Sequence, residues 1–541
     1  MANTKKQEVF DPIQLEVIWN RLVTLLEEQA KTLIRTSFTS ILSDANDLSA
    51  GLFNQAGDMI AQANTGTPGH INSMATGVRH FLKNVDTTKL KDGDVLIGNN
   101  PYEISGHLLD VTIVTPVFYK ESLIGYFAST CHVSDVGGRG FSPEGESIYE
   151  EGLHFPYMKM YEQGVVNETL LTLIRANVRA PYQVIGDLRA QVVAQEVAIS
   201  RLRETLEEFG LRDVEAIGAE IIAISEKAMR KAIEELPDGT YENELYSDGA
   251  EKPILLKCKL IVKGDTVHVD FDGTSKGSKK AINVCLNYTL AYVNYVLKAT
   301  IAPDVPSNEG SFRPVSVSAP EGSVLNAVHP MPTASRHIIG HLAPVCVLGA
   351  LQPVLPDKIP AEGAAAIFAM QVHGVDRSGE SFSNVVFNAG GAGARPGKDG
   401  LNATTFPSGV KGTPIEIIEN TSPILVYEKE LRENSGGDGE FRGGLGQTIT
   451  FGVRTDQPFH VPLMFERTRY APLGYEGGLQ GEKAKVFINE QEIEETKKLY
   501  TLNPDDTVTL QLPGGGGFGD PAKRNEKAKA SDVENGYVIR S

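Results

Sequence analysis

The sequence predicts a mixed α/β (α+β) protein with long helices in its N-terminal half and a C-terminal half rich in strands and glycine. Three observations support this fold class. Residues 11–36 and 183–236 repeat apolar residues at the three- and four-residue spacing of amphipathic helices. Residues 254–262 and 265–272 alternate in the period of two that strands show. The last third of the chain is glycine-rich and has the pattern of short strands.

The composition is typical of a soluble globular protein, and the charge excludes some classes of partner. The 541 residues include 51 lysines and arginines against 69 aspartates and glutamates, a formal net charge of −18. No basic excess is present to neutralise phosphates, so we expect neither a nucleic-acid surface nor binding to an anionic membrane. The N-terminal region has no apolar stretch of the signal-peptide or membrane-span type. The four cysteines are far apart in the sequence, which favours a reducing, cytoplasmic location.

The N-terminal half begins and ends with predicted helices. Asp11 suits the N-cap of the first one. In residues 37–160, short apolar runs alternate with Gly, Asn, Asp and Pro clusters, which is typical of strands joined by turns. The second helical region has a break near Gly210 and ends at the strong turn signal of residues 237–239. The predicted domains are therefore residues 1–239, with the functional site proposed below, and residues 240–541, rich in strands.

The C-terminal half begins with a predicted hairpin closed around Lys263-Gly264. Residues 283–299 are predicted to form a helix, and residues 337–351 are a candidate for another. Three glycine clusters follow, and tight turns or close backbone approach explain them better than phosphate binding does. These clusters are residues 390–393, 436–439 and 513–519. The polar tail from Ala522 onward is either a terminal helix or disordered.

The most informative stretch contains His107 and Asp110, followed after two apolar runs by His132. Imidazole nitrogens and carboxylate oxygens together suit a divalent ion such as zinc, manganese or iron. The intervening runs, residues 111–118 and 123–129, would form a hairpin that brings the two histidines together. The alternative is that these are hydrogen-bonded surface residues, since no stringent motif such as HExxH is present.

Other residues are weaker candidates. His70 lies in a predicted turn, where it either lines a pocket or has a structural role. Asp47 either supplies a further oxygen ligand or forms an Asx-turn or cap. Cys131 adjoins His132, but no third group supports a thiolate nucleophile, so we expect a buried small residue there. Residues 177–181, with Arg179, and residues 186–191, with Asp187, place an arginine and an aspartate at the entrance of the second helical region. They suit an anion or an ion pair, and the ion pair is favoured.

Several motifs of the chain resemble the hydantoinase B/oxoprolinase family. In the N-terminal half they are Asp110 and residues 132–138 (HVSDVGG), 149–153 (YEEGL), 177–179 (NVR) and 186–188 (GDL). In the C-terminal half they are residues 270–275 (DFDGTS), 513–520 (PGGGGFGD) and 532–537 (DVENGY). Their order and spacing extend over essentially the whole chain, so the resemblance is specific.

The resemblance implies a catalytic B subunit in a hetero-oligomer with a hydantoinase A-type partner, which binds ATP and magnesium. The run from Gly391 to Lys398 lacks the first glycine and the Ser/Thr of a P-loop, which agrees with ATP on the partner. The family's metal ligands map onto His107, Asp110 and His132, with Asp47 as a candidate fourth. The family often has two adjacent histidines in the second segment, where this chain has Cys131 before His132.

Two further roles are expected on chemical grounds. Asp135 would lie behind the ligating His132, where a carboxylate can orient the ring, or would act as a base. His70 would line the pocket and contact a small-molecule substrate without binding the ion.

Three functions are compatible with these observations. The leading one is the ATP-dependent hydrolysis of a cyclic amide such as hydantoin, 5-oxoproline or a lactam, in which a metal-activated water attacks the substrate after the A partner has phosphorylated it. The alternative is a subunit of an ATP-dependent ketone carboxylase of the acetone or acetophenone type. The third is a non-catalytic scaffold that docks the ATPase subunit.

Overall fold

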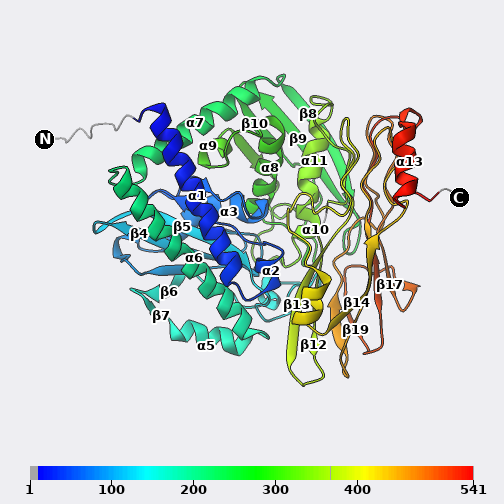
Figure 1. Cartoon of the computed structure of the whole chain (residues 1–541), viewed down its shortest axis with the longest axis horizontal. Coiled ribbons are helices and arrows are strands. Elements are labelled where there is room, and N and C mark those ends of the chain that lie inside the picture. The colour runs from blue at the N-terminus through cyan, green and yellow to red at the C-terminus, as the bar shows by residue number, and fades with distance from the viewer. Residues whose placement is uncertain (1–9, 366, 540–541) are drawn as a thin grey trace.

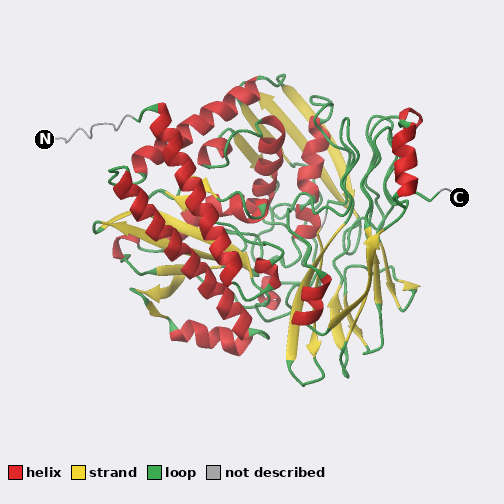
Figure 2. Cartoon of the chain, viewed as in Figure 1, coloured by secondary structure: helices red, strands yellow, loops and turns green. Residues whose placement is uncertain are grey.

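The computed structural model describes residues 10–365 and 367–539. Most of the long helices lie towards one end of the molecule and a strand-rich part forms the other (Figure 1, Figure 2). The helices are α1 (Pro12–Thr36), α2 (Ser40–Ser43), α3 (Pro68–Asn84), α4 (Ile148–Glu151), α5 (Glu168–Asn177), α6 (Pro181–Glu208), α7 (Glu215–Glu234), α8 (Leu286–Ile301), α9 (Glu309–Phe312), α10 (His337–Gly340), α11 (Leu342–Leu351), α12 (Ile415–Thr421) and α13 (Glu526–Glu534). Single 3₁₀ turns lie at Thr87–Lys89 and Pro521–Lys523.

A seven-stranded antiparallel sheet carries the candidate site. Its strands, in spatial order, are β2 (Met59–Gln62), β1 (Gly51–Phe53), β5 (Ser122–His132), β4 (Asp110–Tyr119), β3 (Val95–Gly98), β6 (Met158–Glu162) and β7 (Val165–Val166). Helices α1 and α6 pack together on one face, and α3 packs on the other. Because successive strand residues point to opposite faces, Ile113 lies in the core beneath α6 whereas Val114 lies in the core around α3. Both faces are therefore covered, which explains why β4 and β5 are apolar along most of their length.

A four-stranded sheet follows in the middle of the chain. Its strands, in spatial order, are β11 (Val315–Ser318), β10 (Thr266–Asp270), β9 (Ile254–Lys263) and β8 (Gly239–Ser247). Helix α11 packs against β8 and β9, and α8 packs against both α11 and α3. The helices α8 and α11 thus connect this sheet to the α3 face of the first one.

Two further sheets form the strand-rich end. One has the order β13 (Ser381–Ala389), β12 (Ile367–Val375), β16 (Phe459–Pro462), β19 (Leu499–Leu502). The other has the order β14 (Ile424–Leu431), β15 (Gln447–Val453), β20 (Val508–Gln511), β17 (Lys485–Ile488), β18 (Gln491–Glu492). A second hydrophobic core, which includes Phe368, Phe451 and Leu510, lies between these sheets.

Beside these sheets, glycine-rich segments pack backbone against backbone, and we call them the glycine layer. The layer consists of residues 390–393, 436–446, 473–481 and 513–519, and Figure 2 shows them as loops running side by side near α13. The amide of Gly515 donates to the Gly444 carbonyl at 2.8 Å. A Cβ added at Gly515 would lie 2.0 Å from the carbonyl oxygen of Ala392. Close backbone approach, one of the two predicted explanations of the glycine clusters, therefore requires glycine here.

Most of the predicted helices and the hairpin are confirmed. The Asp11 side chain accepts hydrogen bonds from the backbone N–H groups of Ile13 and Gln14 as the N-cap of α1. Gly210, at the break between α6 and α7, has a φ of +65°, and Gly264, in the β9–β10 turn, has a φ of +58°. The tail from Ala522 contains a terminal helix, α13.

Helix α3 is not predicted by the pattern, and His70 lies within it rather than in a turn. Its first residues, Pro68-Gly69-His70, have the composition of a turn. Its buried face includes small and polar residues such as Asn72, Ser73 and Gly77, so the apolar spacing of a helix is weak.

The predicted division at residue 239 coincides with the passage from α7 to β8. However, the main hydrophobic core continues across it, because Leu22, Val267 and Met464 belong to one cluster of buried side chains. A domain boundary at this residue therefore stays a prediction.

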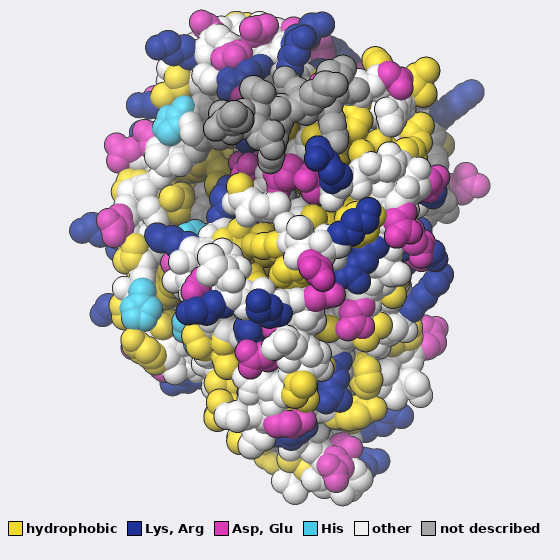
Figure 3. All heavy atoms as spheres, turned by 90° about the vertical axis from the view of Figure 1, so that its left-hand side faces the viewer, with side chains coloured by type: hydrophobic (Ala, Val, Ile, Leu, Met, Phe, Trp, Pro, Cys, Tyr) yellow, Lys and Arg dark blue, Asp and Glu magenta, His cyan; other side chains and the backbone are white. Residues whose placement is uncertain are grey.

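The surface mixes charges of both signs on the face that Figure 3 shows, where acidic and basic side chains alternate with hydrophobic ones. The acidic excess is thus not gathered on this face. Among the described residues, no helix combines the length and the apolar character needed to span a membrane.

Candidate metal centre

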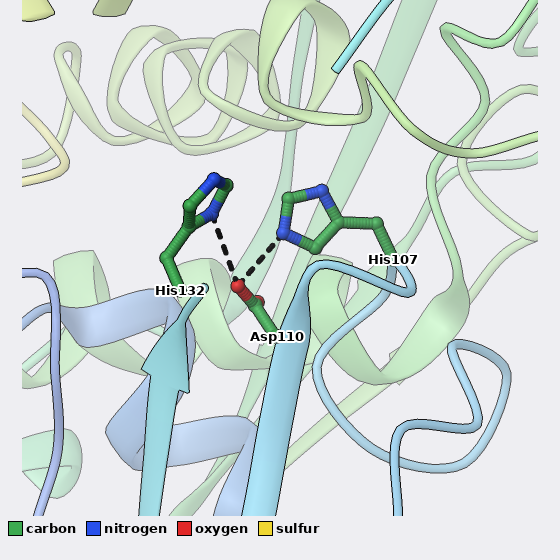
Figure 4. A group of neighbouring side chains, drawn as sticks. All are labelled: His107, Asp110 and His132. Atoms are coloured by element: carbon green, nitrogen blue, oxygen red, sulfur yellow. Dashed lines mark hydrogen bonds and ion pairs between the residues drawn. The ribbon is translucent and has the colours of Figure 1, made fainter. Parts of the chain in front are cut away.

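The β4–β5 hairpin places two of the predicted ligands side by side. Asp110 is the first residue of β4 and pairs across the sheet with His132, the last residue of β5. His107 lies in the turn before β4, with its Nε2 2.7 Å from Asp110 Oδ1, and His132 Nδ1 lies 3.4 Å from the same oxygen. Figure 4 shows both imidazole rings next to the carboxylate, beyond the ends of the two strands.

These three side chains have the geometry of a metal site. All are buried, and one potential ligand atom from each lies within 4.8 Å of the other two. The hairpin that the sequence predicts is therefore the feature that assembles them.

Helix α3 and the segment before β1 bring the other two predicted residues to the same place. His70, in the first turn of α3, has its Nε2 3.0 Å from Asp110 Oδ2 and its Nδ1 3.5 Å from Asp47 Oδ1. Asp47 lies beside the end of β5, where its Oδ2 is 3.9 Å from His132 Nδ1. Burial alone would lower the pKa of His70, but the negative charges of Asp110 and Asp47 outweigh it and raise that pKa.

The hydrogen-bond partners of His107 indicate its tautomer, and the tautomer shows whether these residues suit a metal ion. Its Nδ1 lies 2.9 Å from the carbonyl oxygen of Ala334, which can only accept, so Nδ1 carries a proton. Burial, followed by the charge of Arg336, lowers the pKa of His107 to about 3, so the ring is neutral and Nε2 carries a lone pair. That lone pair faces Asp110 Oδ1 at 2.7 Å. Both atoms are acceptors and no proton lies between them, so without a cation their contact is repulsive. A divalent ion bound by both groups resolves the conflict, so the donor set fits a metal.

Arg336 sets the charge on the opposite side of Asp110. It contacts Asp110 Oδ2 through Nη2, donates from Nε to the Ser105 carbonyl at 2.7 Å, and lies over the ring of Tyr288 at 4.1 Å from its centroid. Burial would raise the pKa of Asp110, but the positive charge of Arg336 outweighs it and holds that pKa well below its ordinary value. Asp110 is therefore ionised although it is fully buried.

These residues line a small, largely closed cavity. The space open to the centres of water molecules is about 30 Å³, which is room for about two waters. Asp47, His70, His107 and His132 form part of its lining, and apolar side chains such as Phe141, Phe387 and Val410 form another part. In this conformation the cavity therefore has room for water, and a ring-sized molecule would enter only if the lining side chains moved apart.

Helices α8, α10 and α11 contribute cavity residues that the sequence analysis did not predict. His337 and His341 lie one helical turn apart and line the cavity together with Tyr288 and Tyr292. His341 Nε2 lies 3.1 Å from the Tyr288 hydroxyl and 3.0 Å from the Tyr292 hydroxyl. The His-x-x-x-His spacing in a predicted helix is the one signal that could have identified the two histidines.

The carboxylate of Asp135 has its hydrogen bonds outside the candidate metal centre. Its Oδ1 accepts from Arg179 Nη1 at 2.6 Å and from the Gly137 amide at 3.2 Å, and its Oδ2 accepts from the Arg179 amide. Gly137 and Gly138 have φ values of +77° and +54°, and this turn takes the chain away from the end of β5. The carboxylate thus anchors the segment before α6, and none of its hydrogen bonds among the described residues reaches His132. Arg179 forms its ion pair with Asp135, whereas Asp187 accepts from Phe38 and Thr39. The role of Asp135 as an orienting group or a base stays a prediction.

Cys131 faces away from the site. Neighbouring strand residues point to opposite faces, and Cys131 is part of the main core with side chains of α1 and α6. Burial raises the pKa of its thiol, as expected for an unreactive core residue. The departure from the adjacent-histidine pattern therefore lies on the other side of the sheet from His132.

Comparisons with known proteins agree with this picture. The family model described as Hydantoinase B/oxoprolinase matches residues 11–521. The chain is 32% identical to the B subunit of a putative D-/L-hydantoinase of Pseudomonas sp. (strain NS671), over 98% of this chain and 93% of that protein. It is 30% identical to the 5-oxoprolinase PfmaA of Pestalotiopsis fici over 95% of this chain, but it spans only 42% of that longer protein. The crystal structure of the ATP-dependent caprolactamase from Pseudomonas jessenii superposes with a TM-score of 0.90 at 28% identity, covering 98% of this chain and 95% of that one.

Proposed function

Since the chain belongs to the hydantoinase B/oxoprolinase family, we propose that it is the catalytic B subunit of an ATP-dependent hydrolase of cyclic amides. The observation that carries this proposal is the buried group of His107, Asp110 and His132, in which a histidine lone pair and a carboxylate face each other. The names of the relatives, a hydantoinase subunit, a 5-oxoprolinase and a caprolactamase, support a ring amide as the substrate class.

In this proposal, a divalent ion such as zinc, manganese or iron is held by the three residues, with Asp47 as the fourth ligand. Such an ion supplies a Lewis acid that lowers the pKa of a water towards about 7. The protein's own groups prepare the site. The Ala334 carbonyl holds His107 in the tautomer that leaves Nε2 free, and Arg336 keeps Asp110 ionised. His70 lines the cavity between the two carboxylates, where it contacts the substrate.

The partner in this proposal is a hydantoinase A-type protein that binds ATP and magnesium. An unactivated cyclic amide is stable in water, so phosphorylation of the amide oxygen by the partner would make its carbon electrophilic before water attacks. The hydantoinase relative is itself named as one subunit of an enzyme, which supports a two-subunit assembly. The greater length of the 5-oxoprolinase relative supports it too, because the rest of that chain has room for an equivalent of the partner.

The test is reconstitution with an A-type partner. The complex should open hydantoin, 5-oxoproline or caprolactam only when ATP is present, and without added bicarbonate. Ketone consumption that requires bicarbonate, with every ring left intact, would show a carboxylase instead. A purified chain that holds no stoichiometric metal and adds nothing to the partner's activity would show a scaffold.

A further inference from the structure

A histidine that the proposed function does not use lies in the same cavity as the candidate metal ligands. His337 is the first residue of α10 and its exposed fraction is 3%. Its ring centroid lies 5.1 Å from that of Phe141, and the Phe141 centroid lies 5.1 Å from His132 and 5.8 Å from His107. Phe141 therefore lies between His337 and the two candidate metal ligands His107 and His132. His337 lines the cavity from the side of α10.

Neither ring nitrogen of His337 has a hydrogen-bond partner within the described part of the chain. The other cavity histidines are better satisfied: His107 Nδ1 bonds the Ala334 carbonyl, and His70, His132 and His341 each have only one ring nitrogen without a partner among the described residues. A buried polar group without a partner costs about 1–3 kcal/mol. Two such nitrogens on one ring, inside a cavity, indicate a side chain whose partner arrives with a ligand.

On the side of α10, the described lining of the cavity presents a neutral hydrogen-bonding group, His337, and no charged group that is free to bind a ligand. Burial, then His341 and Arg336, hold the pKa of His337 well below its ordinary value, so its ring is neutral. Arg336, the one arginine among the described lining residues, is already engaged by Asp110 and by the Ser105 carbonyl. A neutral imidazole has one N–H donor and one acceptor, which matches the C=O and N–H groups of an amide.

We propose that His337 hydrogen-bonds the ring amide of the substrate from the α10 side of the cavity while the metal group acts on the same amide. This inference rests on the proposed function and deepens it, because it assigns the recognition of the amide to a residue outside the metal site. His337 is not one of the side chains that come within ligand distance of each other at the candidate metal site, so a role as a metal ligand is not supported.

The experiment compares three variants of the metal-loaded chain in complex with an A-type partner. His337→Ala removes both nitrogens, and His337→Gln keeps one donor and one acceptor. His268→Ala is the matched control, because His268 lies on β10, outside the cavity lining, with Ser316 and Ser318 as partners. We expect H337A to keep one ion per chain and to lose about 10- to 100-fold in kcat/KM for ring opening, the loss that one unmade hydrogen bond to the substrate produces. H337Q should recover part of this loss, and H268A should stay within about twofold of wild type.

Two results would overturn the inference. Loss of the ion in H337A would make His337 a metal ligand, and an unchanged kcat/KM would make it a core residue. If the wild-type complex opens none of the rings, the proposed function fails, and the inference is then tested by calorimetric titration of the metal-loaded chain with hydantoin. Weaker hydantoin binding by H337A than by wild type would support the assignment. Equal affinity, or no binding by wild type, would refute it.

Discussion

Asp110 is the residue on which the candidate site depends. Its two carboxylate oxygens are approached by the side chains of His70, His107, His132 and Arg336, all of which are buried. A carboxylate in such a place stays ionised because the buried guanidinium of Arg336 contacts it. Removing it therefore affects both the ion and the arginine on its other side.

We predict that Asp110→Ala loses bound metal and ring opening while the helices stay folded. Because Arg336 is then buried without its partner, the free energy of unfolding should fall by about 3 kcal/mol. Elemental analysis measures the bound metal, the reconstituted assay measures ring opening, circular dichroism measures the helices and urea denaturation measures the free energy of unfolding. Asp270→Ala on β10, whose carboxylate bonds Ser318 outside the cavity, is the control and should keep its metal. An Asp110→Ala chain that retains stoichiometric metal would contradict the site.

Glu151 gives a pH-dependent prediction at the same scale. Its Oε1 accepts from the amides of Thr333 and Ala334, so it fixes the segment whose carbonyl holds His107. Burial raises the pKa of Glu151 to about 8, although the hydrogen bonds from Ala334 and Thr333 oppose this rise. The pKa of Glu151 in the folded state lies above the ordinary value of 4.5. Its contribution to the free energy of unfolding is therefore complete below about pH 4.5 and is lost as the pH rises to about 8.

The matched variant for this prediction is Glu151→Gln, which cannot ionise but retains the accepting oxygen. Between pH 5 and pH 8 the wild type should lose up to about 4 kcal/mol relative to E151Q, as measured by urea unfolding. Parallel pH profiles for the two proteins would show that Glu151 does not titrate in this range.

At the scale of elements, the hairpin and the helix that form the site differ in how well the sequence predicts them. Strands β4 and β5 are apolar runs with a short turn between them, so pairing them in register already places Asp110 opposite His132. Helix α3 packs through glycine, serine and asparagine instead of an apolar stripe, so no periodicity marks it. The glycine clusters predict close backbone approach, but not which segments approach each other.

The glycine layer allows a matched pair of substitutions. Gly515→Ala places a Cβ 2.0 Å from a backbone oxygen that cannot move without shifting the layer, so we expect a loss of several kcal/mol in stability. Gly412→Ala meets no atom within 4 Å and has no positive φ, so it should be neutral or stabilising by about 0.5 kcal/mol. Thermal unfolding of the two variants measures the difference, and equal stability would contradict the packing described for the layer.

At the scale of the whole molecule, the cavity is where prediction from sequence ends. Its walls come from α3, the turn before β4, the end of β5, α8, and α10 with the following His341. Strands β12 and β13 and residues 408–410 complete the lining. The candidate metal ligands His107, Asp110 and His132 are recognisable because one hairpin and the turn before it carry them. Arg336 and His337 lie more than 200 residues after Asp110 in the sequence, and tertiary packing, including that of α8 against α3, brings them to the same cavity. No local pattern encodes that contact.

Metal removal should lower the free energy of unfolding of the whole chain, because an ion that binds only the folded state stabilises that state. At a free metal concentration about 100-fold above Kd, the stabilisation is about 2.7 kcal/mol. Adding a chelator should therefore lower Tm, and restoring zinc, manganese or iron should reverse the change. Asp110→Ala should show the same Tm with and without chelator. A chelator effect of equal size in that variant would place the ion elsewhere.

The glycine layer also has a calorimetric consequence. Unfolding usually raises the heat capacity because apolar surface becomes hydrated, whereas newly exposed peptide groups lower it. The segments of the layer expose mostly peptide groups when they separate, since their contacts are between backbones. We therefore expect the heat-capacity increment per residue to be smaller for this end of the molecule than for the helix-covered sheet. The stability of the layer would then vary less steeply with temperature than that of the sheet which carries the candidate metal centre.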